Sequence, residues 1–346
     1  MKALRMTLPL GALSRHRAAL YGVAAILLMF FHAPIDLPAS ALGRVARWLK
    51  DASVCAVELF VLLSPMGLYR SLKGGRGLAS FYRRRLLRVV LPAFVVGAVF
   101  YGANSGGVVT YLLSLTFVSF WFGHSTFWYV GFILTMYALY PAIYALQRRS
   151  PRALWVLFAA SILISLFVDR AFSEYASVYG PGLDRIPIFL LGCILAPKIE
   201  RNDRIPAWIC ALSLIAYIPV WSYAMAPGHL RSYWLLSMSN SLLVLGLLPP
   251  MTAFFEWLAR GAFRRYLYRL DAMVGAVSLE IYLLFTRVLR LLEQTENYQS
   301  GTASDDKCIV AAFVITPIAA MALSAFCRAI EQAFHATRAP KIDAKD

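Results

Sequence analysis

The chain has 346 residues, of which 60% are hydrophobic and only 15% are charged, and its mean hydropathy is +0.64. This composition is too apolar for a soluble domain of that length, so we expect a membrane protein. The formal net charge of +16 does not indicate a nucleic-acid partner, because the basic residues lie beside apolar segments and form no linear tail.

Eleven apolar runs follow one another from the N-terminus. The first run follows a basic segment and has no small-residue cleavage site. We therefore expect it to remain as a helix and not to be removed as a signal peptide. The fourth run holds Thr110 and Ser114 and is short, so it is either an extra spanning helix or a re-entrant segment. The runs lie at approximately 19–35, 53–69, 87–103, 108–121, 127–146, 153–168, 185–197, 206–225, 232–254, 272–292 and 308–328.

The charge of the loops decides between these two topologies. If 108–121 does not span, the segments on one side of the membrane hold 25 of the 34 Lys and Arg residues, and cytoplasmic loops are the ones rich in these residues. We therefore predict a single all-α domain over residues 1–346, a polytopic transmembrane bundle of about ten helices with both termini in the cytoplasm. The basic segments are 1–18, 70–88, 147–152, 198–205, 255–271 and the tail from 328.

Two ionisable residues are expected at a similar depth near the outer ends of the first two helices. His32 ends the first run, and Glu58 lies one turn into the second. An ionised carboxylate is costly in hydrocarbon, so Glu58 should face the bundle and find a partner, for which His32 is the nearest candidate in sequence. An imidazole oriented by a carboxylate suits a general base. Alternatively, His32 caps its helix at the interface and Glu58 hydrogen-bonds a carbonyl as a neutral acid.

Other residues in the spans have both a structural and a functional interpretation. Pro65 should kink the second helix near Ser64. Arg85 and Arg88, one turn apart at the start of the third helix, anchor the topology and bind lipid headgroups, or present cations to a phosphorylated donor such as coenzyme A. Arg185 and Arg287 lie outside the positive-inside pattern, and Glu280 is a candidate partner for Arg287. The five cysteines all fall in apolar runs without metal-ligand spacing, which predicts reduced packing residues and no metal site.

Four passages together give the chain a resemblance to the acyltransferase-3 family of integral-membrane acyltransferases. RAALYGVAAILLMFFHA is similar to the family's first helix, which ends in its essential histidine, and VELFVLLSPMGLYRSL resembles its acidic second helix. FYRRRLLRVVLP and STFWYVGFILTMYALYP resemble the basic start of the third helix and a later aromatic helix. Three positions depart from the family pattern: Tyr21 stands where Arg is frequent, Pro65 where Gly is usual, and Phe285 where a second histidine occurs.

The resemblance implies transfer of an acyl group, usually acetyl from acetyl-CoA, to sugars of exported or envelope molecules. It implies His32 as catalytic histidine, Glu58 as the acidic residue of the second helix, and Arg85 and Arg88 as the donor-side cations. Arg17, the arginine nearest to Tyr21 and one turn before it, is a further candidate for a donor-side cation. No tightly bound cofactor is expected; acyl-CoA is the donor substrate, and the partners are an envelope glycan or lipid-linked sugar and the lipids of a bacterial inner membrane. Two other classes stay open: a proton-coupled transporter or flippase of an envelope precursor, and a sensor or scaffold without chemistry.

Overall fold

The computed structural model describes residues 7–75, 77–101, 120, 127–226, 232–295 and 304–336, and in these ranges the chain is mostly helical, with one short ribbon of two strands and short connecting segments. The elements are β1 (Thr7–Pro9), α1 (Gly11–Arg15), α2 (Arg17–His32), α3 (Ala41–Ala52), η2 (Ser53–Cys55), α4 (Ala56–Lys73), α5 (Leu78–Tyr101), α8 (Trp128–Arg149), α9 (Pro151–Ala171), α10 (Ser173–Leu183), α11 (Ile186–Glu200), β2 (Arg204–Pro206), α12 (Ala207–Ala224), α13 (Tyr233–Ala259), α14 (Ala262–Ala276), α15 (Ser278–Thr295) and α16 (Ser304–Ala336).

Long apolar helices dominate the described part of the chain, which confirms the predicted all-α polytopic bundle. Seven of them are long and apolar enough to cross a membrane, or eight if α14 and α15, which meet at a 78° bend, form one span. Nine of the ten runs expected to span each coincide largely with one helical segment, and the run 272–292 crosses the junction of α14 and α15. The number of spans and the side on which the termini lie stay predictions, and residues 108–121 lie outside the described residues.

The second predicted span is the end of a much longer helix. Residues Ala41–Lys73 form one helical segment of 33 residues, in which the amphipathic α3 precedes α4. At about 1.5 Å per residue this segment is roughly 50 Å long, well over the ~30 Å hydrocarbon core, so it extends beyond the membrane. The kink expected at Pro65 stays a prediction; Pro65 lies inside α4 and packs against Gly192 of α11.

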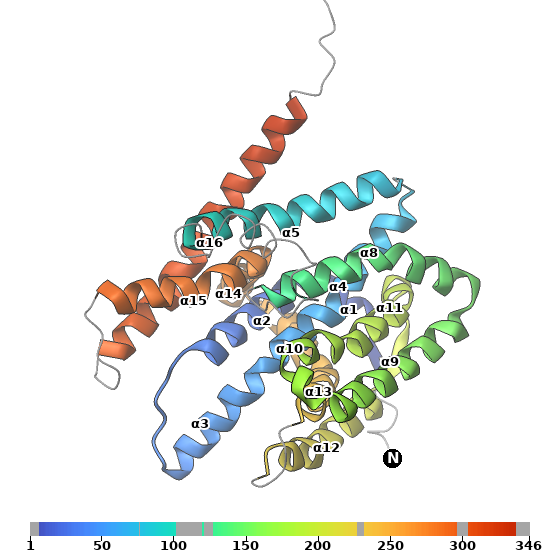
Figure 1. The fold of residues 1–346 in the computed structure, drawn as a ribbon, viewed down its shortest axis with the longest axis horizontal. Helices are drawn as coiled ribbons and strands as arrows, with labels where there is room; N and C mark the ends of the chain where they lie inside the picture. Colours follow the sequence, from blue (N-terminus) through green and yellow to red (C-terminus); the bar gives the residue numbers. More distant parts are fainter. Residues whose placement is uncertain are drawn as a thin grey trace, which may run out of the picture.

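Close packing of α2 and α14 depends on two glycines. A Cβ atom on Gly275 would lie only 1.8 Å from the carbonyl oxygen of Ala18, and one on Gly22 would lie 2.1 Å from that of Asp271. The backbones of these two helices therefore touch, as small residues permit in membrane bundles. This contact holds the junction of α14 and α15 beside α2, on the side of the bundle where α15, α16 and α5 gather in Figure 1.

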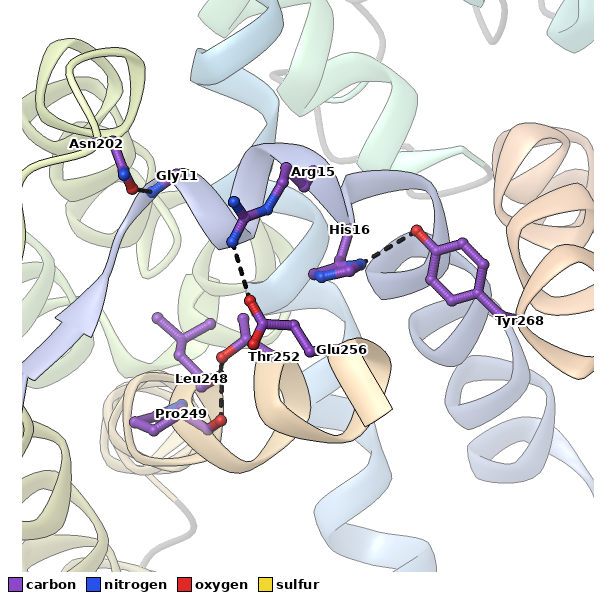
Figure 2. Close-up of polar contacts among 9 residues, drawn as sticks. All are labelled: Gly11, Arg15, His16, Asn202, Leu248, Pro249, Thr252, Glu256 and Tyr268. Carbon is purple, nitrogen blue, oxygen red and sulfur yellow. Dashed lines mark hydrogen bonds and ion pairs between the residues drawn. The ribbon is translucent and has the colours of Figure 1, made fainter. Parts of the chain in front are cut away.

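The N-terminal segment contacts two other chain segments that, like it, are predicted to be cytoplasmic. β1 pairs antiparallel with β2, with Thr7 opposite Pro206. Figure 2 shows the neighbouring polar contacts: the Gly11 N–H donates to Asn202 Oδ1 at 2.9 Å, Arg15 Nη2 lies 2.9 Å from Glu256 Oε1, and His16 Nδ1 lies 3.1 Å from the Tyr268 hydroxyl. Residues 7–18 and the segments 198–205 and 255–271 thus meet at one end of the bundle, as the charge pattern requires if they share one face of the membrane.

Candidate functional site

A cavity of about 680 Å³ lies between α2, α4, α5, α8 and the α14–α15 junction. Its volume is in the range of about 300–1,000 Å³ that is usual for a pocket holding one small molecule. Four of the five site residues predicted from the sequence line it: Arg17, His32, Arg85 and Arg88. The other polar and aromatic lining residues that matter below are Tyr21, Ser64, Trp128, Tyr129, Tyr137, Arg185, Tyr282 and Arg328.

Arginines from three helices mark one end of the cavity. Arg17 comes from the first turn of α2, Arg85 from α5, and Arg328 from α16. Gly67 of α4 lies beneath two of them: a Cβ atom there would be 3.0 Å from Arg17 Nη1 and 3.9 Å from both Arg85 Nη atoms. Two guanidinium groups therefore share one small region where the wall has no side chain, which creates a site of strong positive potential.

The partners of these arginines show which charges are left uncompensated. Arg85 Nη2 donates to the Gly67 carbonyl at 2.8 Å, while its buried Nε has no partner. Arg88 donates to the Ala276 carbonyl and has an ion pair of 3.8 Å with Glu280, which is 1% exposed. Arg17 and Arg85 have no carboxylate partner in the described part of the chain. An anion such as phosphate would complete their coordination.

Glu280 thus has a different partner from the one considered from sequence. It lies against Arg88 and not against Arg287. The reason is the bend between α14 and α15, which places Glu280 in the first turn of α15 and on the side facing α5.

Aromatic side chains form the middle of the cavity. Tyr21, Tyr129, Tyr137 and Tyr282 line it, and the rings of Tyr129 and Tyr282 lie 5.4 Å apart in an edge-to-face arrangement. Ser64 lies among the first three tyrosines. Such a wall offers apolar surface for a chain of methylene groups together with hydroxyl groups that bind amides.

His32 lies at the other end of the cavity. It is the last residue of α2, fifteen residues beyond Arg17, a separation of about 22 Å along the helix. Its ring stacks edge-on with Phe31 at 5.1 Å, and Lys50 donates to the Phe31 carbonyl beside it at 3.2 Å. The imidazole is exposed and lines the cavity, so it is open to a molecule from outside the bundle and to one inside the cavity.

The expected pair of His32 and Glu58 is not formed, which corrects the geometry inferred from sequence. Glu58 is 0% exposed, does not line the cavity, and lies 3.0 Å from Arg185 Nη2 and 3.4 Å from the Ser237 hydroxyl. Matching depth in neighbouring helices was the basis of the expectation, but depth does not fix the direction in which a side chain points. The fully buried carboxylate of Glu58 instead forms an ion pair with the guanidinium of Arg185, so each charge has a partner of opposite sign.

Two arginines that line the cavity were not among the site residues predicted from the sequence. Arg328 was counted only as a topology signal at the end of the last span, and its position gave no further indication. The position of Arg185 was an indication, because a cation within a predicted span and outside the positive-inside pattern is costly and is therefore a candidate functional residue. It is 8% exposed, lines the cavity and places its guanidinium 5.1 Å from the centre of the Trp128 ring.

The five cysteines are buried in the structure and form no disulfide with one another. Among the residues that the structure describes, no group of three or more His, Cys, Asp and Glu side chains is arranged to hold a metal ion.

Comparison with known proteins assigns the chain to a family. A family model described as an acyltransferase domain matches residues 19–327, which is nearly the whole chain and includes every residue of the cavity except Arg17, Ala18 and Arg328. Neither the curated proteins nor the solved structures contain a match.

Proposed function

The chain belongs to the acyltransferase-3 family and is a multi-pass membrane acyltransferase, and we propose that it moves an acyl group, acetyl in the first instance, from acyl-CoA to a hydroxyl group of an envelope or exported glycan. The observation that supports the proposal most is the cavity, which has uncompensated guanidinium groups at one end and His32 at the other. One molecule with an anionic head and a reactive tail would fit both ends.

The arginine end is proposed to bind the phosphates of the donor. Arg17 and Arg85 would contribute hydrogen bonds to the phosphate oxygens, and Arg88, whose charge is shared with Glu280, would contribute less. The aromatic middle would hold the thioester arm, whose methylene and amide groups match tyrosine side chains. The positive-inside pattern places this end towards the cytoplasm, where acyl-CoA is made.

The His32 end is proposed to carry out the chemistry. The imidazole takes the proton of the acceptor hydroxyl while the oxygen attacks the thioester carbonyl, and the C–S bond then breaks. The proton on His32 passes to the sulfur of the departing CoA. Because His32 is exposed at the end of α2, an acceptor too large for the cavity can still reach it. This fits a glycan or lipid-linked sugar at the outer face of a bacterial inner membrane.

The alternative of a proton-coupled transporter depended on a relay between His32 and Glu58. The ion pair of Glu58 with Arg185 removes the geometric support for that relay. An acyltransferase and a transporter differ in what they consume, since only the former releases CoA from acyl-CoA.

The test is to follow free thiol release from acetyl-CoA by the purified protein in proteoliposomes, with and without a glycan-containing envelope extract. We expect extract-dependent CoA release and recovery of the acetyl group on the glycan. The matched control is His32→Gln, which keeps a polar side chain of similar size and should release no CoA. Thiol release that is equal in the wild type and His32→Gln, or absent from both, would contradict the proposal.

A further inference from the structure

Arg185 occupies a position that charge balance alone does not explain. It precedes α11, where the span from Val178 to Glu200 is interrupted between α10 and α11. Its charge is balanced by Glu58, yet the two residues differ in exposure to the site: Arg185 lines the cavity, while Glu58 lies behind it. A pair that served only to neutralise itself would gain nothing from presenting its cation to the cavity.

Most of the hydrogen-bonding capacity of Arg185 is unused. A guanidinium has five N–H donors. In the described part of the chain one Nη donates to the Pro181 carbonyl at 2.7 Å, the other lies 3.0 Å from Glu58 Oε1, and the buried Nε has no partner. A buried donor without an acceptor is costly, by about 1–3 kcal/mol, unless a ligand supplies the acceptor.

The surroundings hold this guanidinium firmly. The Ser237 hydroxyl lies 3.4 Å from Glu58 Oε1 and 3.2 Å from the Asp184 carbonyl oxygen, so its one proton is shared between these two acceptors. The Trp128 ring lies against the guanidinium carbon at 5.1 Å. A charged donor group that is fixed before the substrate arrives is the arrangement that stabilises charge developing in a transition state.

We infer that Arg185 is a catalytic residue that donates an N–H hydrogen bond to the thioester carbonyl oxygen during acyl transfer. This inference rests on the proposed function. The acceptor oxygen forms a bond to the carbonyl carbon as His32 takes its proton, the C=O electron pair moves to the oxygen, and Arg185 stabilises that oxyanion. The electron pair then returns, the C–S bond breaks, and the sulfur receives the proton from His32. Glu58 acts through Arg185 as a positioning residue.

The first experiment compares Arg185→Gln, Glu58→Gln and the double variant for CoA release, with Arg170→Gln as control because Arg170 is an exposed arginine that does not line the cavity. Loss of one oxyanion donor typically lowers kcat by about 10²–10³-fold. We expect that loss in both Arg185→Gln and the double variant, with the KM for acetyl-CoA unchanged, and a smaller loss in Glu58→Gln. If the pair only balances charge, the double variant recovers kcat to within about tenfold of wild type, and the inference is wrong.

A second measurement does not depend on turnover. Acetyl-CoA labelled with ¹³C at the carbonyl is bound to the His32→Gln variant, and the carbonyl stretch is recorded by infrared difference spectroscopy. A hydrogen bond from Arg185 should lower the stretching frequency relative to free acetyl-CoA, and the added Arg185→Gln substitution should abolish that shift while added Arg170→Gln keeps it. An unshifted carbonyl in the His32→Gln protein would overturn the inference, even if the wild type releases CoA as proposed. Absence of CoA release from the wild type would instead overturn the proposed function.

Discussion

Replacing Arg85 by Gln tests the donor end of the cavity with little disturbance of the fold. Among the residues that the structure describes, Arg85 makes one hydrogen bond, to the Gly67 carbonyl, and has no carboxylate partner. Its loss therefore leaves no buried anion uncompensated, whereas loss of Arg88 would leave Glu280 alone at 1% exposure. The Gln side chain keeps an N–H donor but is shorter than that of Arg, so it does not reach the position of the guanidinium group.

The expected effect is a rise in the KM for acyl-CoA with little change in kcat. A hydrogen bond between charged groups contributes about 1.5–3 kcal/mol. Its loss corresponds to roughly ten- to hundredfold weaker binding of acyl-CoA. Arg17 lies beside Arg85 over Gly67, so the double variant with Arg17→Gln should lose more than either single variant. The assay is initial-rate CoA release at varied acetyl-CoA, with Arg84→Gln as control because Arg84 is the preceding residue in α5 and does not line the cavity. An unchanged KM for Arg85→Gln would refute a phosphate-binding role and leave Arg85 as a topology anchor.

Three further predictions concern stability and topology. Gly275→Ala places a methyl group 1.8 Å from the Ala18 carbonyl oxygen, so it should destabilise the protein in detergent by about 1–3 kcal/mol. The control is Gly74→Ala, whose added methyl group would have its nearest contact at 3.3 Å. Equal melting temperatures of the two variants would refute the packing argument. Burial lowers the pKa of His16 below its ordinary value of 6.5, so the unfolded state binds the proton more strongly than the folded state does. The contribution of His16 to the free energy of unfolding is therefore fully present above about pH 6.5 and is lost as pH falls through the folded-state pKa. Melting temperatures from pH 7.5 to 5 should decline less in His16→Gln, and parallel curves would contradict this. In a background lacking the native cysteines, Ser150→Cys and Asn202→Cys should react with an impermeant reagent from the cytoplasmic side only; labelling of either from outside would reject the topology.

The sequence predicted the fold well because membrane segments are specified by composition. Runs of about 20 apolar residues and the distribution of Lys and Arg are local signals, and the predicted runs that lie within the described residues are helical, with 272–292 crossing the bend between α14 and α15. The length of the Ala41–Lys73 helix was missed, because α3 is amphipathic and lacks the uniform hydropathy of a span. The break at residue 277 was missed for a similar reason: the apolar pattern runs through it, while the 78° bend between α14 and α15 is a tertiary feature.

The sequence indicated which residues line the cavity, but not which side chains contact one another. Motif positions identified His32, Arg85 and Arg88, and all three line one cavity. Arg17 was included in spite of Tyr21 at the family's usual arginine position, and it reaches the same cavity from one turn away, with its guanidinium 5.9 Å from the Tyr21 ring. Phe285, at the position of the missing second histidine, is a buried core residue that packs on Phe313. The partners of Glu58 and Glu280 depended on helix rotation, which one sequence does not specify.

Replacement of His32 by Ala, with donor binding and acyl transfer measured on the same preparation, separates a role of His32 in the chemistry from a role in donor binding. His32 lies about 22 Å along α2 from Arg17, so the substitution should leave the Kd for CoA unchanged while lowering acetyl transfer by about 10²–10⁴-fold, the usual contribution of a general base. Normal CoA binding would show that the variant is folded. If His32→Ala keeps more than about a tenth of the wild-type transfer rate while binding CoA normally, His32 is not the base, and the exposed end of α2 is only a helix terminus.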